Sequence, residues 1–263
     1  MPVGSPVGSL LGDLPPPAVS ALLLDLDGTL LDIAPTPDAV RVPLDLPGVL
    51  TRLRDHLGGA LAVVTGRPVE QVEALLGNVP HAIAGEHGGA IRGAPGGEIE
   101  RVSLPDPPVE WIIEAARIVE RHPGALLEQK QRGFVFHYRQ APEHGPALGS
   151  AAEALIAAER GRFHVTPALM AWEVRPRGAD KASAVETVML LAPFEGRRPV
   201  FIGDDATDRD GMRAASALGG AGLWVPEVFG SAAGVRAWLA RAADALDAGA
   251  AAWPDQVTGM SAQ

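Results

Sequence analysis

The chain has 263 residues, of which 32 are acidic and 22 are basic, so its formal net charge at pH 7 is −10. Nucleic acids and anionic membrane surfaces are bound through basic footprints, and this charge balance argues against both as partners. Hydrophobic residues make up 47% of the sequence, enough for a sizeable core, and the length suits one large domain or two small ones. Cysteine is absent, which excludes disulfides, thiolate zinc sites and cysteine nucleophiles.

The beginning of the chain differs from a secretory signal. Residues 1–20 contain no basic residue and carry prolines at positions 15–17. A secretory signal needs a positive start and a compact apolar stretch, so residues 1–19 are expected to be a flexible leader. No apolar run reaches the roughly 18 residues of a membrane span. We therefore expect a soluble, cytoplasmic protein, and a monomer.

Apolar runs and helical stretches alternate along the first hundred residues. Residues 20–26 form a short apolar run that ends at Asp-Gly, which is typical of a buried parallel strand entering a turn. Residues 40–57 are predicted to be helical with breaks at two prolines, and residues 60–64 to form a second buried strand. A helix is predicted over 69–76, and residues 81–92 contain another strand and a Gly-rich turn.

The middle of the chain has a different order of elements. The apolar spacing predicts a helix over 107–122, paired strands over 125–130 and 133–139, a helix over 146–160, and two more strands over 162–166 and 169–175. A helix followed by two strands occurs twice in this region, which is typical of a small α+β unit. We expect this unit to be a cap domain, residues 103–174, inserted into a catalytic core made of residues 20–102 and 175–263.

The strand and helix alternation resumes in the last third of the chain. A helix opens at 178–181, buried strands are predicted over 199–203 and 223–225, and an Ala-rich helix covers 235–251. Taken with the first hundred residues, this alternation predicts an α/β fold with a doubly wound, mostly parallel sheet core. In such a sheet the functional site lies outside the carboxyl ends of the strands.

Two aspartates follow the first predicted strand, in the segment Asp25-Leu26-Asp27-Gly28-Thr29. Side chains two apart on a strand share a face, so Asp25 and Asp27 can both point into one site. One of them could attack a phosphorus atom while the other handles a proton. The alternative is a plain strand ending, where Asp and Gly are common.

A second acidic cluster, Asp204-Asp205-Ala206-Thr207-Asp208, follows the strand over 199–203. A group of carboxylates at a strand end suits Mg²⁺, a hard cation that takes oxygen ligands. A solvated acidic loop is the alternative, and the spacing does not match that of an EF-hand calcium loop. The sequence therefore predicts a metal site at the same edge of the sheet as Asp25.

Two further positions suit the chemistry of a phosphoryl group. Thr65 closes the second strand in Thr65-Gly66-Arg67, where a hydroxyl and adjacent backbone N–H groups can bind a phosphoryl oxygen. Lys181 is one of only two lysines among 22 basic residues, and it opens a helix just before the core resumes. A compact ammonium at this place can neutralise charge on a phosphoryl group.

The order of these four motifs is more informative than any one of them. Asp-x-Asp, Thr, Lys and Asp-Asp-x-x-Asp follow one another as in the haloacid dehalogenase-like phosphohydrolases, which the sequence resembles over nearly the whole chain after residue 20. The resemblance narrows to the trehalose-6-phosphate phosphatase family at Ala84-Gly85-Glu86-His87-Gly88, His122-Pro123-Gly124-Ala125, Leu127-Glu128-x-Lys130, His137-Tyr138-Arg139-Gln140-Ala141-Pro142, Trp172-Glu173-Val174-Arg175-Pro176 and Gly203-Asp204-Asp205-x-Thr207-Asp208.

The resemblance implies a catalytic role for four residues. Asp25 would be the nucleophile and would form an aspartyl-phosphate. Asp27 would protonate the leaving sugar oxygen and then activate the hydrolytic water. Thr65 and Lys181 would hold the phosphoryl oxygens.

The resemblance also implies a ligand set for Mg²⁺. The ion would be held by the carboxylate of Asp25, the backbone carbonyl of Asp27 and the carboxylate of Asp204, with water completing the shell. Asp205 and Asp208 would support the ion, either directly or from a position next to its ligands.

The cap is expected to select the sugar. Glu128 and Lys130 are two apart on a predicted strand and so share a face, and Glu173 is expected to share a face with Leu169. Exposed strands with ordinary salt bridges are the alternative, and the resemblance favours binding of sugar hydroxyls by Glu128, Lys130 and Glu173. Three further substrate-binding candidates are Arg67, His87 and Arg139.

These features together predict Mg²⁺-dependent hydrolysis of trehalose 6-phosphate to trehalose and phosphate, with a small-molecule sugar phosphate as the partner. The family often has Gly-Lys where this chain has Ala168-Leu169, so another disaccharide or glycosyl phosphate stays an alternative substrate. A phosphosugar mutase, which would pass the phosphoryl group to a sugar instead of to water, is a less favoured alternative. A catalytically silent domain is disfavoured because the nucleophile and the metal ligands are all present.

Overall fold

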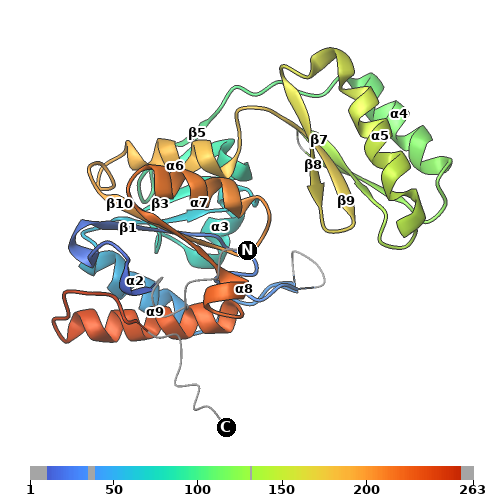
Figure 1. The fold of residues 1–263 in the computed structure, drawn as a ribbon. Coiled ribbons are helices and arrows are strands. Elements are labelled where there is room, and N and C mark those ends of the chain that lie inside the picture. The colour runs from blue at the N-terminus through green and yellow to red at the C-terminus, as the bar shows by residue number, and fades with distance from the viewer. Residues whose placement is uncertain (1–10, 35–38, 131, 256–263) are drawn as a thin grey trace, which may run out of the picture. The chain divides into compact units, whose positions relative to one another are not determined.

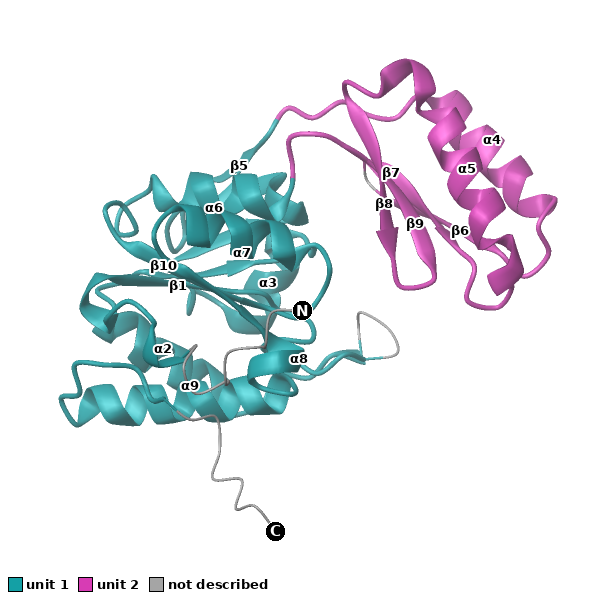
Figure 2. Ribbon diagram, in the orientation of Figure 1, with its two compact units in different colours: residues 1–102, 180–263 teal, residues 103–179 magenta. Residues whose placement is uncertain are grey.

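The computed structural model describes residues 11–34, 39–130 and 132–255. The chain forms two compact units: unit 1 is residues 1–102 with 180–263, and unit 2 is residues 103–179 (Figure 2). Unit 2 runs past residue 174, where the cap was expected to end, because that residue lies inside a strand that continues to Pro176. None of the described helices is both long enough and apolar enough to cross a bilayer.

Unit 1 is built on a seven-stranded sheet in which the pairs β3–β4 and β4–β5 are antiparallel and the other neighbouring pairs are parallel. In spatial order the strands are β11 (Ala221–Trp224), β10 (Arg198–Gly203), β1 (Ser20–Leu24), β2 (Leu61–Val64), β3 (Ala82–Gly85), β4 (Ala90–Arg92) and β5 (Ile99–Arg101). Every residue of β1 and β2 is buried, as expected for strands covered on both faces. The predicted doubly wound, mostly parallel sheet is confirmed.

Helices cover both faces of this sheet (Figure 1). The helices of unit 1 are α2 (Leu46–His56), α3 (Val69–Leu76), α6 (Lys181–Met189), α7 (Asp208–Ala217), α8 (Val225–Val228) and α9 (Ala232–Asp247). Helices α6 and α7 lie together on one face, and α2 and α9 lie on the other. Helix α2 begins well after the predicted start at residue 40, because Pro47 fits the first turn of a helix but not its interior.

The part of the leader that the structure describes is packed against the core. Leu11 and Leu14 are buried in the same apolar cluster as the central strands. The carbonyl of Pro15 accepts hydrogen bonds from the hydroxyl of Ser20 and from the indole N–H of Trp253, each at 2.8 Å. The expectation of a flexible leader is therefore wrong for residues 11–19, and residues 1–10 lie outside the described residues.

Unit 2 is an antiparallel sheet with two helices on one face (Figure 2). The strands are, in spatial order, β6 (Leu126–Lys130), β7 (Gly133–His137), β9 (Ala171–Pro176) and β8 (Phe163–Ala168), and the helices are α4 (Val109–Glu120) and α5 (Gly145–Leu155). Phe134, Phe136 and Val174 are fully buried in a core of their own beneath these helices. Because side chains alternate along a strand, Glu128 and Glu173 belong to the opposite face.

The hairpin between β8 and β9 corrects one expectation. Ala168 pairs with Ala171, so Leu169 and Met170 form the turn and do not belong to a strand. Met170 has a φ of 56°, and Leu169 is 80% exposed at the tip. Leu169 therefore does not share a strand face with Glu173.

Candidate active site

The site is centred on the carboxyl ends of β1 and β10, which are parallel neighbours. The backbone N–H of Asp25, the first residue after β1, donates to the carbonyl of Ile202 in β10 at 2.9 Å. Asp204 is the first residue after β10, so the topology of the sheet sets these two aspartates side by side. This is the arrangement expected when polar residues follow adjacent parallel strands.

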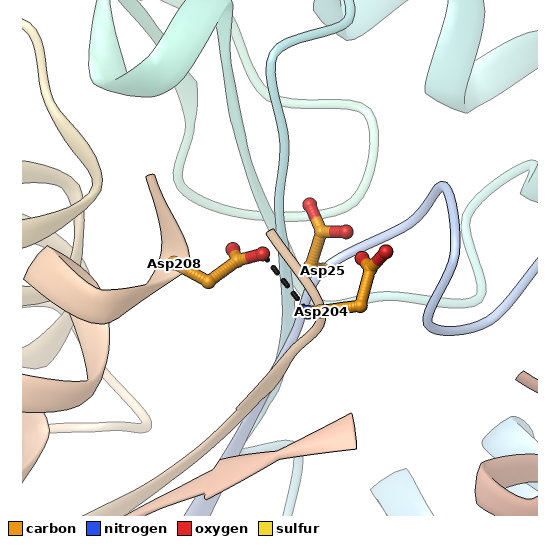
Figure 3. Close-up of side chains that lie close together, drawn as sticks. All are labelled: Asp25, Asp204 and Asp208. Atoms are coloured by element: carbon orange, nitrogen blue, oxygen red, sulfur yellow. Dashed lines mark hydrogen bonds between the residues drawn. The ribbon is translucent and has the colours of Figure 1, made fainter. Parts of the chain in front are cut away.

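Three carboxylates converge at this edge of the sheet (Figure 3). One carboxylate oxygen each from Asp25, Asp204 and Asp208 lies within 4.8 Å of the other two. Asp208 is the first residue of α7, and its Oδ2 accepts hydrogen bonds from the backbone N–H groups of Asp204 and Asp205 at 3.0 and 2.9 Å. The loop between β10 and α7 is thereby closed onto the carboxylate of Asp208.

Two glycines leave the space that this convergence needs. A Cβ atom on Gly28 would lie 2.0 Å from Oδ2 of Asp204, and Gly28 has a φ of 83°, which L side chains rarely adopt. A Cβ atom on Gly203 would lie 2.3 Å from Cγ of Asp208. The glycine of Asp-x-Asp-Gly and the glycine before the second acidic cluster therefore allow their backbones to approach the opposing carboxylates.

Lys181 enters the cluster from the first residue of α6. The N-cap of this helix is Asp180, whose Oδ1 accepts from the backbone N–H of Ser183 at 2.8 Å, while the hydroxyl of Ser183 accepts from the backbone N–H of Asp180 at 3.2 Å. This capping box fixes where the helix begins and thus where Lys181 lies. The Nζ of Lys181 donates to Oδ1 of Asp25 at 2.6 Å and also to Oδ1 of Asp208.

The charges at the site do not balance. Burial, together with the negative charge of neighbouring aspartates, raises the pKa of Asp25 and of Asp204 to about 6, and that of Asp208 to about 7. Burial by itself would lower the pKa of Lys181, but the charges of Asp25 and Asp208 outweigh it and raise that pKa above its ordinary value. The ammonium of Lys181 is therefore shared between the carboxylates of Asp25 and Asp208.

This donor set fits a hard divalent cation. The converging atoms are carboxylate oxygens, which are the ligands that Mg²⁺ prefers. Burial is the main cause of the raised pKa values of Asp25 and Asp204, and the charges of neighbouring aspartates add to it. A divalent ion bound by these carboxylates would favour their charged forms.

Asp205 has a different place from the other acidic residues. Its Oδ1 accepts from the backbone N–H and the hydroxyl of Thr207 at 2.7 and 2.6 Å, and from the backbone N–H of Asp208 at 3.1 Å. Burial acts to raise the pKa of Asp205. The charge of Lys181 and, after it, these hydrogen bonds outweigh burial and lower that pKa. Among the described residues, Asp208 and not Asp205 joins the carboxylate cluster, so Asp205 supports the loop that carries the site.

Asp27 and Arg67 form a close ion pair beside the cluster. Nε and Nη2 of Arg67 donate to the two carboxylate oxygens of Asp27, at 2.5 and 2.7 Å. Arg67 was expected to bind substrate, and its guanidinium is paired with Asp27 in the structure, so its role in binding substrate stays a prediction. Thr65 is buried at the end of β2, and its hydroxyl oxygen accepts from the backbone N–H of Arg67 at 3.2 Å, which leaves the hydroxyl proton free to donate.

His87 lies next to the Thr65 loop. Glu86 and His87 have φ values of 53° and 56°, an uncommon backbone conformation for two consecutive residues with side chains. The backbone N–H of His87 donates to the carbonyl of Thr65 at 2.9 Å. A Cβ atom on Gly66 would lie 2.6 Å from Nε2 of His87, so Gly66 makes room for the imidazole. The expected substrate-binding candidate is thus placed beside the loop that carries Thr65.

The remaining sugar-binding candidates belong to unit 2. The carboxylate of Glu128 accepts from Lys130 and from Nε2 of His137, the latter at 2.8 Å. Glu173 is half-buried on β9, and Arg139 is exposed in the turn after β7. His137 was not among the predicted substrate-binding residues, although the alternation along β7 puts it on the same face as Glu128.

The fold, with carboxylates at the ends of adjacent parallel strands and an inserted α+β unit, defines a haloacid dehalogenase-like hydrolase. The solved C-terminal domain of Candida albicans trehalose-6-phosphate phosphatase has this fold, with a TM-score of 0.62 over 81% of this chain and 78% of that chain at 22% identity. A second structure, of a trehalose-6-phosphate phosphatase related protein, is similar with a TM-score of 0.54 over 75% of this chain and 83% of that chain, at 24% identity.

Sequence comparison identifies the family. Residues 23–232 match the family model described as trehalose-phosphatase. The trehalose-6-phosphate phosphatase of Escherichia coli K12 is 38% identical over 207 residues, which cover 76% of this chain and 75% of that protein. The chain belongs to the trehalose-phosphatase family, whose members are phosphoric monoester hydrolases.

Proposed function

We propose that the protein hydrolyses trehalose 6-phosphate to trehalose and phosphate with Mg²⁺, through a covalent intermediate on Asp25. The observation that carries this proposal is the cluster in which buried Lys181 joins Asp25 to Asp208, with Asp204 alongside. Family membership supports phosphatase activity, and the name of the E. coli relative supports the choice of sugar.

The residues of the site suit a two-step displacement. In the first step an oxygen of Asp25 forms a bond to phosphorus while the bond from phosphorus to the sugar oxygen breaks. Asp27 donates a proton to that oxygen, and trehalose leaves. In the second step Asp27 removes a proton from water, whose oxygen attacks phosphorus and releases Asp25 and phosphate.

The neighbours of these two aspartates have distinct tasks. The ammonium of Lys181 has three protons, of which two are directed at Asp25 and Asp208, and the third can bind a phosphoryl oxygen. The hydroxyl of Thr65 can donate to another. Each carboxylate oxygen of Asp27 accepts one bond from Arg67 and keeps a further lone pair that can carry the proton. Mg²⁺, held by Asp25, Asp204 and the backbone at Asp27, would neutralise charge on the phosphoryl group.

A phosphate-release screen tests the proposal. The purified protein is assayed with Mg²⁺ on a panel of sugar phosphates that includes trehalose 6-phosphate, sucrose 6-phosphate and glucose 6-phosphate. We expect the highest kcat/KM on trehalose 6-phosphate, with one phosphate released for each trehalose formed. A higher value on another sugar phosphate would reassign the substrate, and loss of sugar phosphate without free phosphate would favour a mutase.

Replacing Glu173 by alanine is expected to reduce selectivity for the sugar. A carboxylate that binds sugar hydroxyls contributes to sugar-phosphate turnover but makes no contact with a small aryl phosphate. We expect kcat/KM for trehalose 6-phosphate to fall about 10²-fold, and that for 4-nitrophenyl phosphate to change by less than about threefold. Glu153→Ala on α5, outside the polar face of the sheet, is the matched control, and equal losses on both substrates would remove Glu173 from sugar recognition.

Stabilisation by Mg²⁺ is expected to increase with pH. The pKa values of Asp25, Asp204 and Asp208 lie above the ordinary 3.8, so between about pH 4 and pH 7 the metal-free folded protein binds more protons than the unfolded chain. Its free energy of unfolding therefore falls as the pH rises through this window. The raised pKa of Lys181 adds stability that stays constant here, because both folded and unfolded forms are protonated.

Mg²⁺ competes with protons for the same oxygens, so its stabilising effect should be larger where the carboxylates are ionised. At one Mg²⁺ concentration we expect the increase in Tm to be several degrees larger near pH 8 than near pH 5. Thermal unfolding with and without Mg²⁺ measures this, and Asp204→Asn should abolish the difference. An equal increase at both pH values would argue against metal binding by these carboxylates.

A further inference from the structure

One face of the sheet in unit 2 carries a row of polar groups around an apolar residue. Glu128, Val135 and Glu173 are direct cross-strand partners on β6, β7 and β9, so they lie in one row on the face opposite α4 and α5. Val135 is 6% exposed and lies between the two glutamate residues in the strand register. Neighbouring strands are about 4.8 Å apart, which separates the two glutamate backbones by roughly 10 Å. That span is comparable to one pyranose ring with its hydroxyl groups.

The carboxylate of Glu128 is held at both oxygens. Lys130, two residues along β6, donates to Oε1, and Nε2 of His137 lies 2.8 Å from Oε2. His137 reaches Glu128 diagonally across the strand pair, because it stands opposite Leu126 in the register. The side chains of His137 and Glu128 are 40% and 43% exposed, so the carboxylate is fixed yet open to a ligand.

These two contacts also set the charge of the carboxylate. Burial acts to raise the pKa of Glu128, but the hydrogen bonds from Lys130 and His137 outweigh it and lower that pKa. An ionised carboxylate whose oxygens each accept one hydrogen bond has acceptor positions left for sugar hydroxyls. A side chain held in this way loses little rotamer freedom when the ligand binds.

We propose that His137 is a positioning residue for sugar recognition, which orients the Glu128 carboxylate so that it accepts hydrogen bonds from the hydroxyl groups of a sugar lying over Val135. The proposal rests on the proposed function, because it concerns the same sugar phosphate. His137 itself takes no part in the displacement at phosphorus. Its removal should therefore affect how well the sugar is held and not how fast the bound ester reacts.

Two replacements of His137 test whether its hydrogen-bond donor is what positions the Glu128 carboxylate. His137→Ala removes the donor, whereas His137→Gln places an amide N–H close to the position of Nε2. With the best sugar phosphate of the panel, we expect His137→Ala to raise KM about tenfold while kcat changes less than about twofold. His137→Gln should restore most of the loss. The ratio of kcat/KM for the sugar phosphate to kcat/KM for 4-nitrophenyl phosphate should fall about tenfold in the alanine variant.

The matched control is His56→Ala in unit 1. His56 forms a similar ion pair, with its Nε2 2.6 Å from Oδ1 of Asp247, and both side chains are about as exposed as those of His137 and Glu128. Urea unfolding of every variant checks that the fold is kept. Equal losses on the sugar and aryl substrates, a fall in kcat alone, no effect in the alanine variant, or no rescue by glutamine would each overturn the proposal. If the wild type prefers another sugar phosphate, the proposed substrate fails while the test of His137 still applies to the preferred one.

Discussion

Replacement of Asp25 by asparagine is expected to lower phosphate release by about 10⁴-fold or more, because the amide cannot form the bond to phosphorus. The fold should be kept. Burial raises the pKa of Asp25 to about 6, which means that the folded protein disfavours the charged carboxylate. A neutral amide of nearly the same shape therefore removes an unfavourable charge, and Lys181 keeps its bond to Asp208.

Two measurements check this expectation. Phosphate release from trehalose 6-phosphate gives the loss of activity, and urea unfolding without Mg²⁺ near pH 7.5 gives the free energy of unfolding, which should equal or exceed that of the wild type. Asp55→Asn, an exposed aspartate on α2, is the matched control for both. If Asp25→Asn retained full activity, the nucleophile would have to be another group.

Replacement of Lys181 by methionine is expected to affect both catalysis and stability. Loss of the ammonium removes a charge that can bind a phosphoryl oxygen, and we expect kcat to fall roughly 10³-fold. It also leaves Asp25 and Asp208 without their buried partner, which should cost about 3 kcal/mol of unfolding free energy at neutral pH. The cost should be smaller near pH 5, because the two carboxyls can then be protonated.

Lys181→Arg tests whether a positive charge is sufficient at this position or whether a compact ammonium is required. Lys181 is 2% exposed, and its Nζ is enclosed between two carboxylates, so a planar guanidinium has no room there. We expect the arginine variant to recover little of the activity. Arg117→Met, an exposed cation on α4, is the control for the loss of a positive charge. Near-normal turnover in either Lys181 variant would be incompatible with the proposed role of the ammonium.

The strand-end aspartates were predictable because the evidence for them is local. An apolar run such as that of β1 must be buried, and a polar residue directly after it must lie at the carboxyl edge of the sheet. The same reasoning placed Asp204 after β10. It did not predict the antiparallel β4 and β5, which are short, nor helix α7, where the acidic cluster continues directly into the helix.

The choice between Asp205 and Asp208 required the tertiary structure. Both are aspartates in one short acidic segment, and nothing in the sequence distinguishes the one that joins the carboxylate cluster from the other. The outcome depends on α7 beginning at Asp208, and on Gly203 having no side chain where the carboxyl group of Asp208 lies. Asp205 is left to accept hydrogen bonds from the backbone of the loop.

The sequence alone determined the sheet class, the family and the four motifs, because these depend on apolar runs and on residues close together in the chain. Only the tertiary structure decided which partner each side chain takes. The sequence did not predict that Arg67 pairs with Asp27, or that the register of β6 and β7 sets His137 beside Glu128. Such contacts depend on how strands and loops meet in space, and residue spacing along the chain carries no information about that.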